Sequence, residues 1–254
     1  MAVLACGAMI WLRRITILLG LLMLGPLSMA ALGDARVAAD WRTATRASAG
    51  LAPPAATTRE AVLQVYAARA VAWRGIFAVH SWIAAKPEGA SAYTTWEVVG
   101  WHVFRGGEAV QIHNGDPDRH WFGAKPVLLA DLRGAAAARA IEDVKEAVAA
   151  YPWHSEYRTW PGPNSNTFVA FVTRRVPALK ANLPPTAIGK DYLGETSFVG
   201  RAPSGGGVQL SLWGLLGVLA SAEEGIEFNI LGLSFGIDPA HLGLRLPGIG
   251  IVQP

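Results

Sequence analysis

The sequence predicts an α+β fold in which an antiparallel sheet packs against helices. Three strand-like runs, Trp73–Lys86, Tyr93–Phe104 and Glu108–His113, are separated by short turn segments, which favours an antiparallel meander. A run with the apolar spacing of a helix then spans Ala135–Pro152. From residue 204 the chain is rich in glycine and apolar residues, and two strand-like runs joined at "AEEG" predict a C-terminal β-ribbon.

The first 33 residues predict an export segment. Arg13 and Arg14 precede an uncharged apolar run, an order that keeps the N-terminus in the cytoplasm and exports the rest of the chain. The small residues at Ser28–Ala30 fit a cleavage site, whereas the length of the run fits a span of a ~30 Å bilayer. Residues 1–33 are therefore a signal peptide or an N-terminal membrane anchor. The expected location is the bacterial inner membrane with the domain facing the periplasm, or the periplasm itself if the segment is cleaved.

Composition narrows the function classes. Hydrophobic residues make up 52% of the chain and charged residues only 16%, which favours an envelope or membrane setting. The net charge of +3 comes without a cluster of lysines and arginines, so nucleic acid is not an expected partner. The single cysteine, Cys6, lies in the export segment, which leaves the domain without a thiol nucleophile or thiolate ligand. The histidines match no metal-ligand spacing, and neither a metal nor a cofactor is expected.

The chain divides into four predicted parts. A linker over residues 34–58 follows the export segment and leads into an α+β core domain over 59–203. The core is expected to open with a short amphipathic helix in "REAVLQVYAARA" (59–70), because its apolar residues are spaced as on one helix face. A later helix is expected to begin near Asn166. Residues 204–254 form the Gly-rich β extension, packed on the core or on the membrane.

The stretch "WPGPNSNTFVAFV" (160–172) places Ser165 at the predicted start of that later helix. A group at a helix N-terminus meets unpaired backbone N–H donors and the positive end of the helix dipole, which suits a nucleophile and an oxyanion. Serine and asparagine are also the preferred N-cap residues, so a helix cap explains the same pattern. The sequence leaves both interpretations open.

A serine nucleophile needs a base, because its hydroxyl is not ionised near neutral pH. His80 is the candidate, since it lies inside the apolar run "IFAVHSWIA", where strand alternation places it on one face with Trp82. His102, on the next predicted strand, is the candidate to orient His80. The backbone N–H groups of Asn166 and Thr167 are the candidate oxyanion hole. The candidate binding residues come from the flanking loops: Asn164, Asn166, Tyr157, Arg158, Trp160, Lys190 and Asp191.

The order of these parts resembles the circularly permuted papain-like superfamily, which includes lecithin:retinol acyltransferase-like proteins and relatives of cell-wall peptidases. "NSNTF" (164–168) is similar to the stretch that opens the nucleophile helix there, with Ser165 in the position of a cysteine. The stretches "WRGIFAVHSWIAAK", "WPGPNSNTFVA" and "LPPTAIGKDYLG" also resemble a bacterial family of unknown function whose members carry an N-terminal membrane segment. The first resemblance implies a permuted papain-like fold and acyl chemistry; the second implies a location and no reaction.

Three functions follow as hypotheses. The first is a membrane-tethered serine-type hydrolase or acyltransferase acting on lipid acyl bonds or on peptidoglycan amide or ester bonds, with Ser165 attacking and His80 as base. The second is a non-catalytic module of the same fold that binds a lipid or an envelope ligand in the cleft. The third is a structural envelope protein that interacts through its Gly-rich C-terminal region.

Overall fold

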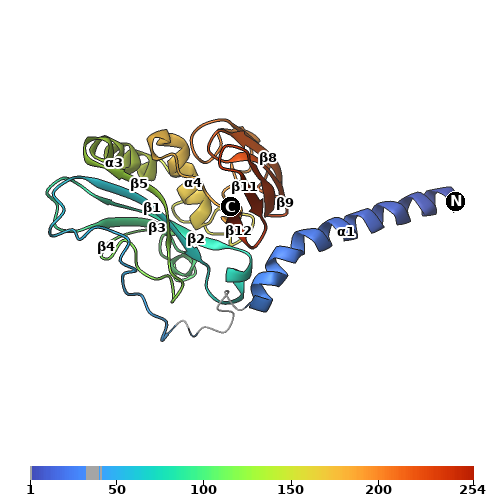
Figure 1. The fold of residues 1–254 in the computed structure, drawn as a ribbon, viewed down its shortest axis with the longest axis horizontal. Helices are drawn as coiled ribbons and strands as arrows, with labels where there is room; N and C mark the ends of the chain where they lie inside the picture. The colour runs from blue at the N-terminus through green and yellow to red at the C-terminus, as the bar shows by residue number, and fades with distance from the viewer. Residues whose placement is uncertain (1, 33–39, 41) are drawn as a thin grey trace.

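The computed structural model describes residues 2–32, 40 and 42–254. Its first element, α1 (Ala2–Leu32), projects from one side of a body formed by the rest of the chain (Figure 1). Within the described residues, Met9–Leu32 is the one helical segment that is long and apolar enough to cross a membrane, judged by length and composition. The ends of the predicted export segment, and residues 34–39 and 41 of the predicted linker, lie outside the described residues.

A five-stranded antiparallel sheet forms the first half of the body, in the order β4-β3-β2-β1-β5. Its strands are β1 (Val62–Arg69), β2 (Val79–Lys86), β3 (Thr94–Val98), β4 (Val110–Asn114) and β5 (Val127–Arg133). Short helical turns, η1 (Ala72–Ile76) and α2 (Gly100–Val103), precede β2 and follow β3. The predicted antiparallel meander is present as β2-β3-β4.

Helices α3 (Gly134–Ala149) and α4 (Ser165–Arg175) cover one face of this sheet (Figure 1), and the turn η2 (Pro177–Leu179) follows α4. The main core lies between these helices and the sheet, with Ile83, Ile141 and Phe168 fully buried in it. The α+β class predicted from the sequence is therefore confirmed.

One predicted element type and two predicted boundaries are wrong. Within residues 59–70, Val62–Arg69 form strand β1 and not a helix. Strand β1 lies between β2 and β5 and is buried on both faces, which removes the alternation that identifies a strand. The predicted strand from Trp73 begins only at Val79. The predicted strand to Phe104 ends at Val98, where the chain turns into α2.

The Gly-rich C-terminal region is a seven-stranded antiparallel meander and not a two-stranded ribbon. Its strands, consecutive in space as in sequence, are β6 (Val199–Gly200), β7 (Val208–Leu212), β8 (Leu216–Ser221), β9 (Gly225–Ile230), β10 (Leu233–Asp238), β11 (Gly243–Leu246) and β12 (Gly250–Val252). Gly207, which precedes β7, and Gly225, the first residue of β9, have positive φ. A Cβ at either position would lie within 2.2 Å of a backbone oxygen of the neighbouring chain segment. Glycine is thus required at these close turns.

Candidate functional site

Asn164 caps helix α4 and leaves Ser165 as the first helical residue. The Oδ1 atom of Asn164 accepts hydrogen bonds from the backbone N–H groups of Asn166 (3.0 Å) and Thr167 (3.1 Å). In return, Thr167 Oγ1 accepts from the Asn164 N–H at 3.1 Å, which completes a capping box. Ser165 is therefore not the cap. Within the described part of the chain, its hydroxyl takes no hydrogen-bond partner.

Asn166 ties the start of α4 to strand β2 on both sides of His80. Its Nδ2 donates to the Val79 carbonyl oxygen at 2.9 Å, and its Oδ1 accepts from Ser81 Oγ at 2.8 Å. The same Nδ2 also donates to the carbonyl oxygen of Ile188 at 2.8 Å. Because the residues before and after His80 are both bound to Asn166, the position of His80 relative to the helix start is fixed.

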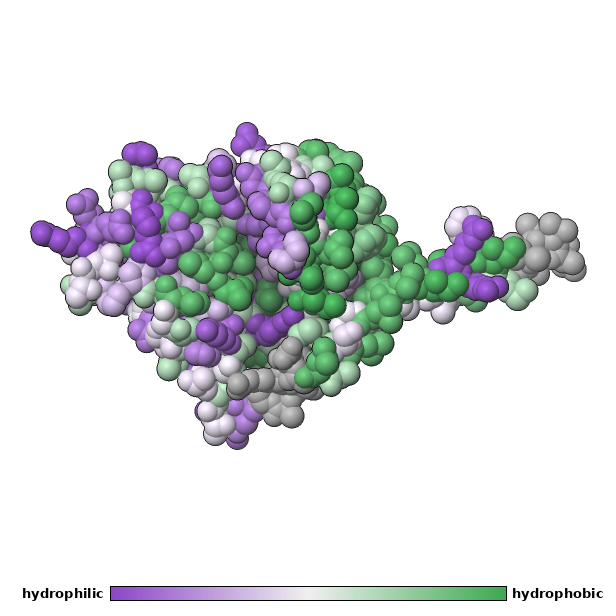
Figure 2. All heavy atoms as spheres, in the orientation of Figure 1, coloured by the Kyte–Doolittle hydropathy of each residue, from purple (hydrophilic) through white to green (hydrophobic). Residues whose placement is uncertain are grey.

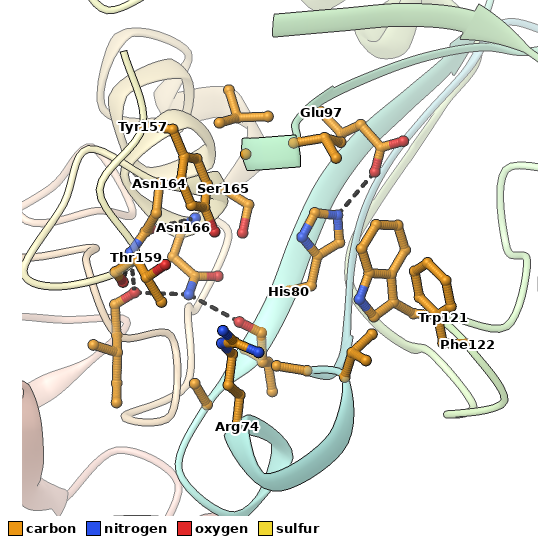
Figure 3. Close-up of a pocket in the computed structure, with 18 of the residues that line it drawn as sticks. Arg74, His80, Glu97, Trp121, Phe122, Tyr157, Thr159, Asn164, Ser165 and Asn166 are labelled. Carbon is orange, nitrogen blue, oxygen red and sulfur yellow. Dashed lines mark hydrogen bonds and ion pairs between the residues drawn. The ribbon is translucent and has the colours of Figure 1, made fainter. Parts of the chain in front are cut away.

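His80 is 7% exposed and makes one side-chain hydrogen bond, from Nε2 to Glu97 Oε2 at 2.8 Å. Its ring stacks on the indole of Trp121, with centroids 3.6 Å apart and planes within 8°. These two contacts hold the ring on both its edge and its face. In Figure 3 the ring nitrogen that does not contact Glu97 points toward Ser165 and Asn166.

Glu97 on β3 is the hub of a buried polar cluster. Besides His80, its carboxylate accepts hydrogen bonds from His113 Nε2 at 2.8 Å and from an Arg119 guanidinium nitrogen at 2.6 Å. Burial alone would raise the pKa of Glu97. The hydrogen bonds from His113 and His80, together with the charge of Arg119, outweigh burial and hold that pKa well below 4.5. Glu97 is thus a carboxylate throughout the physiological pH range.

The pKa of His80 is shifted in the direction expected of a general base. Burial lowers the pKa of His80 below 6.5, and the opposing effects of the Glu97 hydrogen bond and charge do not restore it. The ring is therefore neutral at pH 7. Because a carboxylate only accepts hydrogen bonds, Glu97 selects the tautomer that carries the proton on Nε2 and leaves Nδ1 with its lone pair.

A cavity of ≈ 1070 Å³ contains both His80 and Ser165 in its wall. Its lining is mostly aromatic and aliphatic, with arginines as the main charged groups: Trp73, Phe77, Trp101, Phe104, Trp121, Phe122, Tyr157, Trp160, Ile188, Leu231 and Leu233, and Arg46, Arg74, Arg105 and Arg119. A space of this size and character is typical of a small-molecule or lipid site.

Tyr157 and Trp160, two of the candidate binding residues, line this cavity. The Tyr157 ring packs closely on Gly100 of α2, where a Cβ would lie 2.4 Å from two ring carbons. Trp160 is half-exposed, and its Nε1 donates to the carbonyl oxygen of Leu231 at 2.9 Å. The loop before α4 is thereby linked to the turn between β9 and β10.

Several predicted site residues lie elsewhere or act differently. His102 is on α2 with its ring 6.1 Å from that of Trp101, it does not line the cavity, and Glu97 holds His80 in its place. Arg158 is an exposed partner of Glu195 at 2.8 Å. The predicted oxyanion hole from the Asn166 and Thr167 N–H groups is wrong, because Asn164 occupies both donors.

Lys190 and Asp191 are buried in a polar network beneath the C-terminal sheet and do not line the cavity. The Lys190 ammonium contacts the carboxylates of Asp191 and Glu227, and Glu227 also accepts from Arg245 Nε at 2.6 Å. Arg245 in turn donates to the carbonyl oxygen of Leu183 at 2.6 Å. These residues attach the C-terminal sheet to the loop that follows η2.

Sequence reasoning missed Glu97 and Trp121. The signal for Glu97 was present in "TTWEVV", where a carboxylate interrupts an apolar strand and shares a face with neither Trp96 nor Val98. A buried strand carboxylate requires partners, which would have directed attention to the adjacent strand that carries His80.

Among the described residues, no group of three or more histidine, cysteine or carboxylate side chains is arranged to hold a metal ion.

The fold and the site together define an α+β protein in which a helix start and a His–Glu pair face one apolar cavity. The chain belongs to the family described as "Protein of unknown function (DUF3750)", whose model matches residues 60–192, more than half of the chain. The predicted membership of a family of unknown function is thus confirmed. Comparison with curated proteins and with solved structures found no match. The matched segment contains His80, Glu97 and Ser165 and ends before β6.

Proposed function

We propose that this protein is a serine-type acyl hydrolase or acyltransferase, with Ser165 as nucleophile and His80 as general base. The observation that carries the proposal is the pairing of two side chains. One is a serine at a helix start whose hydroxyl has no hydrogen-bond partner among the described residues, and the other is a histidine whose second ring nitrogen is held by a buried carboxylate. Glu97 is the positioning residue. The proposal includes a permuted papain-like arrangement, with serine in place of cysteine.

The proposed reaction has two steps. Ser165 Oγ attacks the acyl carbonyl carbon while its proton passes to His80 Nδ1, and the resulting imidazolium is stabilised by Glu97. The bond to the leaving group then breaks as His80 returns that proton to the leaving oxygen or nitrogen, which leaves an ester on Ser165. Water or an acceptor alcohol attacks this ester, again with His80 taking the proton. The bond between the acyl carbon and Ser165 Oγ then breaks as His80 returns the proton to that oxygen, which releases the acid or the new ester and regenerates the serine. The backbone N–H of Ser165, which Asn164 leaves free, is the proposed oxyanion donor.

The cavity favours a lipid acyl group over a cell-wall peptide. Its wall is dominated by indole, phenyl and aliphatic groups, which can bury an alkyl chain but leave amides without partners. The arginines in the same wall, including Arg74 and Arg105, would pair with an anionic headgroup. A lipid ester is therefore the proposed substrate class. The same apolar wall favours, as the second candidate, a module that binds lipid without turnover.

An alkyl fluorophosphonate tests the proposal, because it phosphonylates only a serine that has been activated. The full-length protein in detergent micelles should gain one adduct per chain, with the modified peptide containing Ser165. Ser165→Ala should abolish labelling and His80→Gln should slow it by ~10²-fold or more. Ser155→Ala removes an exposed serine outside the cavity wall and should label as the wild type does.

Two outcomes would reject catalysis. One is the absence of an adduct in a folded protein that still binds a fluorescent fatty acid, which would favour the lipid-binding module. The other is labelling that survives Ser165→Ala unchanged, since the reactive serine would then lie elsewhere.

A further inference from the structure

The seven-stranded sheet exposes apolar side chains on its outer face and buries polar side chains on its inner face. Along β7, Val208, Leu210 and Leu212 point outward and are exposed, whereas Gln209 and Ser211 point inward and are buried. Strands β9, β10 and β11 follow the same pattern and bury Glu227, Asn229, Ser234 and Arg245, whereas β8 buries Leu219 on the inward face. Sheets in water place the apolar face inward, so this sheet is built for an apolar surrounding on its outer side.

The register of the strands shows how complete the outer face is. Leu210 pairs with Val218, Val218 with Phe228, and Phe228 with Phe235, so these side chains lie in one row across four strands. Following the pairs through the sheet gives an outer face made entirely of apolar residues: Val199, Val208, Leu210, Leu212, Leu216, Val218, Ala220, Ile226, Phe228, Ile230, Leu233, Phe235, Ile237, Leu244, Leu246 and Val252. An apolar surface of this extent marks an interaction site.

Helix α1 docks against the same sheet. Its Gly25 lies so close to the turn between β11 and β12 that a Cβ would come 1.9 Å from the Pro247 carbonyl oxygen, and Pro26 packs on Gly248. Leu22 and Met29 are buried in this contact, whereas Leu24 and Leu27 on the opposite side of the helix remain exposed. In Figure 2 the hydrophobic surface runs without a break from the sheet onto this part of α1.

The length of α1 decides how deep the body would sit in a bilayer. Arg13 and Arg14 cannot lie in the hydrocarbon core, and the uncovered apolar stretch after them, Ile15–Leu21, spans only about 10 Å at 1.5 Å per residue. The hydrocarbon core of a bilayer is ~30 Å thick. The docked stretch Leu22–Leu32 therefore has to span the rest of the hydrocarbon core. The domain surface that packs beside this stretch then lies at the same depth in the bilayer.

We propose that α1 is a retained anchor and that the outer face of the β6–β12 sheet is immersed in the adjoining leaflet of the membrane. The domain is then a monotopic body whose apolar side replaces lipid around the docked helix. The polar half of the molecule, at the opposite end in Figure 2, faces water. Leu233 belongs to the outer face and also lines the cavity, so the immersed face reaches the cavity rim.

Site-directed spin labelling of the full-length chain tests this seating without reference to any catalysis. In a Cys6→Ser background, nitroxides are attached through Leu210→Cys or Phe228→Cys on the outer face. Ile112→Cys, an exposed apolar position on β4, is the matched control. The protein is placed in nanodiscs of phosphatidylethanolamine and phosphatidylglycerol, and collision rates with O₂ and with a water-soluble nickel chelate are compared.

Labels at positions 210 and 228 should collide severalfold more with O₂ than with the nickel chelate, and the label at 112 should show the reverse. Nickel access at 210 and 228 equal to that at 112 would overturn the proposal, because the sheet would face water. Shielding from both reagents would overturn it in favour of a protein partner, and spin–spin broadening would overturn it in favour of a second copy. Because two labelled positions are compared, one poorly folded variant does not decide the result.

Discussion

The carboxylate of Glu97 holds three donors at once, so Glu97→Gln is the most informative single substitution. The carboxylate accepts from His80, His113 and Arg119 at 2.6 to 2.8 Å. His113 and Arg119 share Oε1 and His80 uses Oε2, so the glutamine carbonyl oxygen can keep the donors of only one of these two oxygens. The loss of the negative charge weakens the bonds that remain, since a hydrogen bond to a charged group contributes ~1.5–3 kcal/mol and a neutral one less. We expect a destabilisation of ~3–5 kcal/mol, the range found when one partner of a buried ion pair is removed.

Equilibrium urea unfolding of the full-length protein in detergent micelles, followed by tryptophan fluorescence at pH 7, measures this loss. Glu108→Gln makes the same change of charge at an exposed position and should alter the free energy of unfolding by less than ~0.5 kcal/mol. If Glu97→Gln and Glu108→Gln differ by less than ~1 kcal/mol, Glu97 is not the hub of the cluster and the reasoning fails.

The pH dependence of the same difference gives an independent check. The folded-state pKa of Glu97 lies below its unfolded value of 4.5, so its contribution to stability is complete above pH 4.5 and is lost as the pH falls toward the folded-state pKa. The difference between wild type and Glu97→Gln should therefore shrink as the pH falls below 4.5. Between pH 5 and 7 the difference also reflects His80, whose pKa the Glu97 hydrogen bond and charge raise against burial. A difference that grows below pH 4.5 would show that the carboxylate is not held in its charged form.

Two further predictions concern the helix start and the base. Asn164→Ala should lower the free energy of unfolding by ~2 kcal/mol or more, because two capped N–H groups and two further hydrogen bonds are lost. Ser165→Ala should lower it by less than ~1 kcal/mol, because the Ser165 hydroxyl has no partner among the described residues. Equal losses of the two variants in urea unfolding would contradict this prediction. The folded-state pKa of His80 lies below 6.5, so the unfolded chain binds more protons below that pH and stability should fall as the pH drops from 6.5 to 5. His80→Gln should remove that part of the pH dependence, and an unchanged curve would refute the depressed pKa.

The local sequence signals place Ser165 and His80 on the elements where the structure has them. The stretch "PGPNSN" predicts a helix start at Ser165, and "IFAVHSWIA" predicts a strand at His80, because turn chemistry and alternation are properties of a few adjacent residues. The carboxylate in "TTWEVV" is a local signal as well, but its pairing with His80 depends on the register of β3 against β2, which neither run contains by itself.

The errors elsewhere have related causes. Strand β1 lies between β2 and β5 with both faces buried, so its sequence carries no alternation and its apolar spacing predicts a helix instead. The strands of the C-terminal region alternate with apolar residues outward, the reverse of the pattern in a soluble sheet, so the sequence predicts fewer strands than are present. The sequence predicts Lys190 and Asp191 as site residues of a loop, because a buried ion network across two segments 37 residues apart leaves no local signature.

That buried network explains why a sheet outside the cavity matters to the site. Glu227, an inward side chain of β9, pairs with Lys190 and so fixes the loop that precedes it, and Arg245 on β11 holds Glu227 in place. The carbonyl oxygens of Ile188 and Gly189 in this loop accept hydrogen bonds from the Asn164 and Asn166 amides and from Thr167 Oγ1. Gly189, with φ +102°, approaches the Asn164 side chain so closely that a Cβ would lie 2.3 Å from it.

The residues that bracket Ser165 are therefore bound on one side to the C-terminal sheet through this loop and on the other side to β2 through Val79 and Ser81. Because polar contacts of this kind have defined lengths and directions, they set the helix start more narrowly than apolar packing would. The inward polarity of the C-terminal sheet thus has a structural reason that is separate from the apolar character of its outer face. The inward polar face helps to position Ser165 opposite His80, whereas the apolar outer face contacts the surroundings of the molecule.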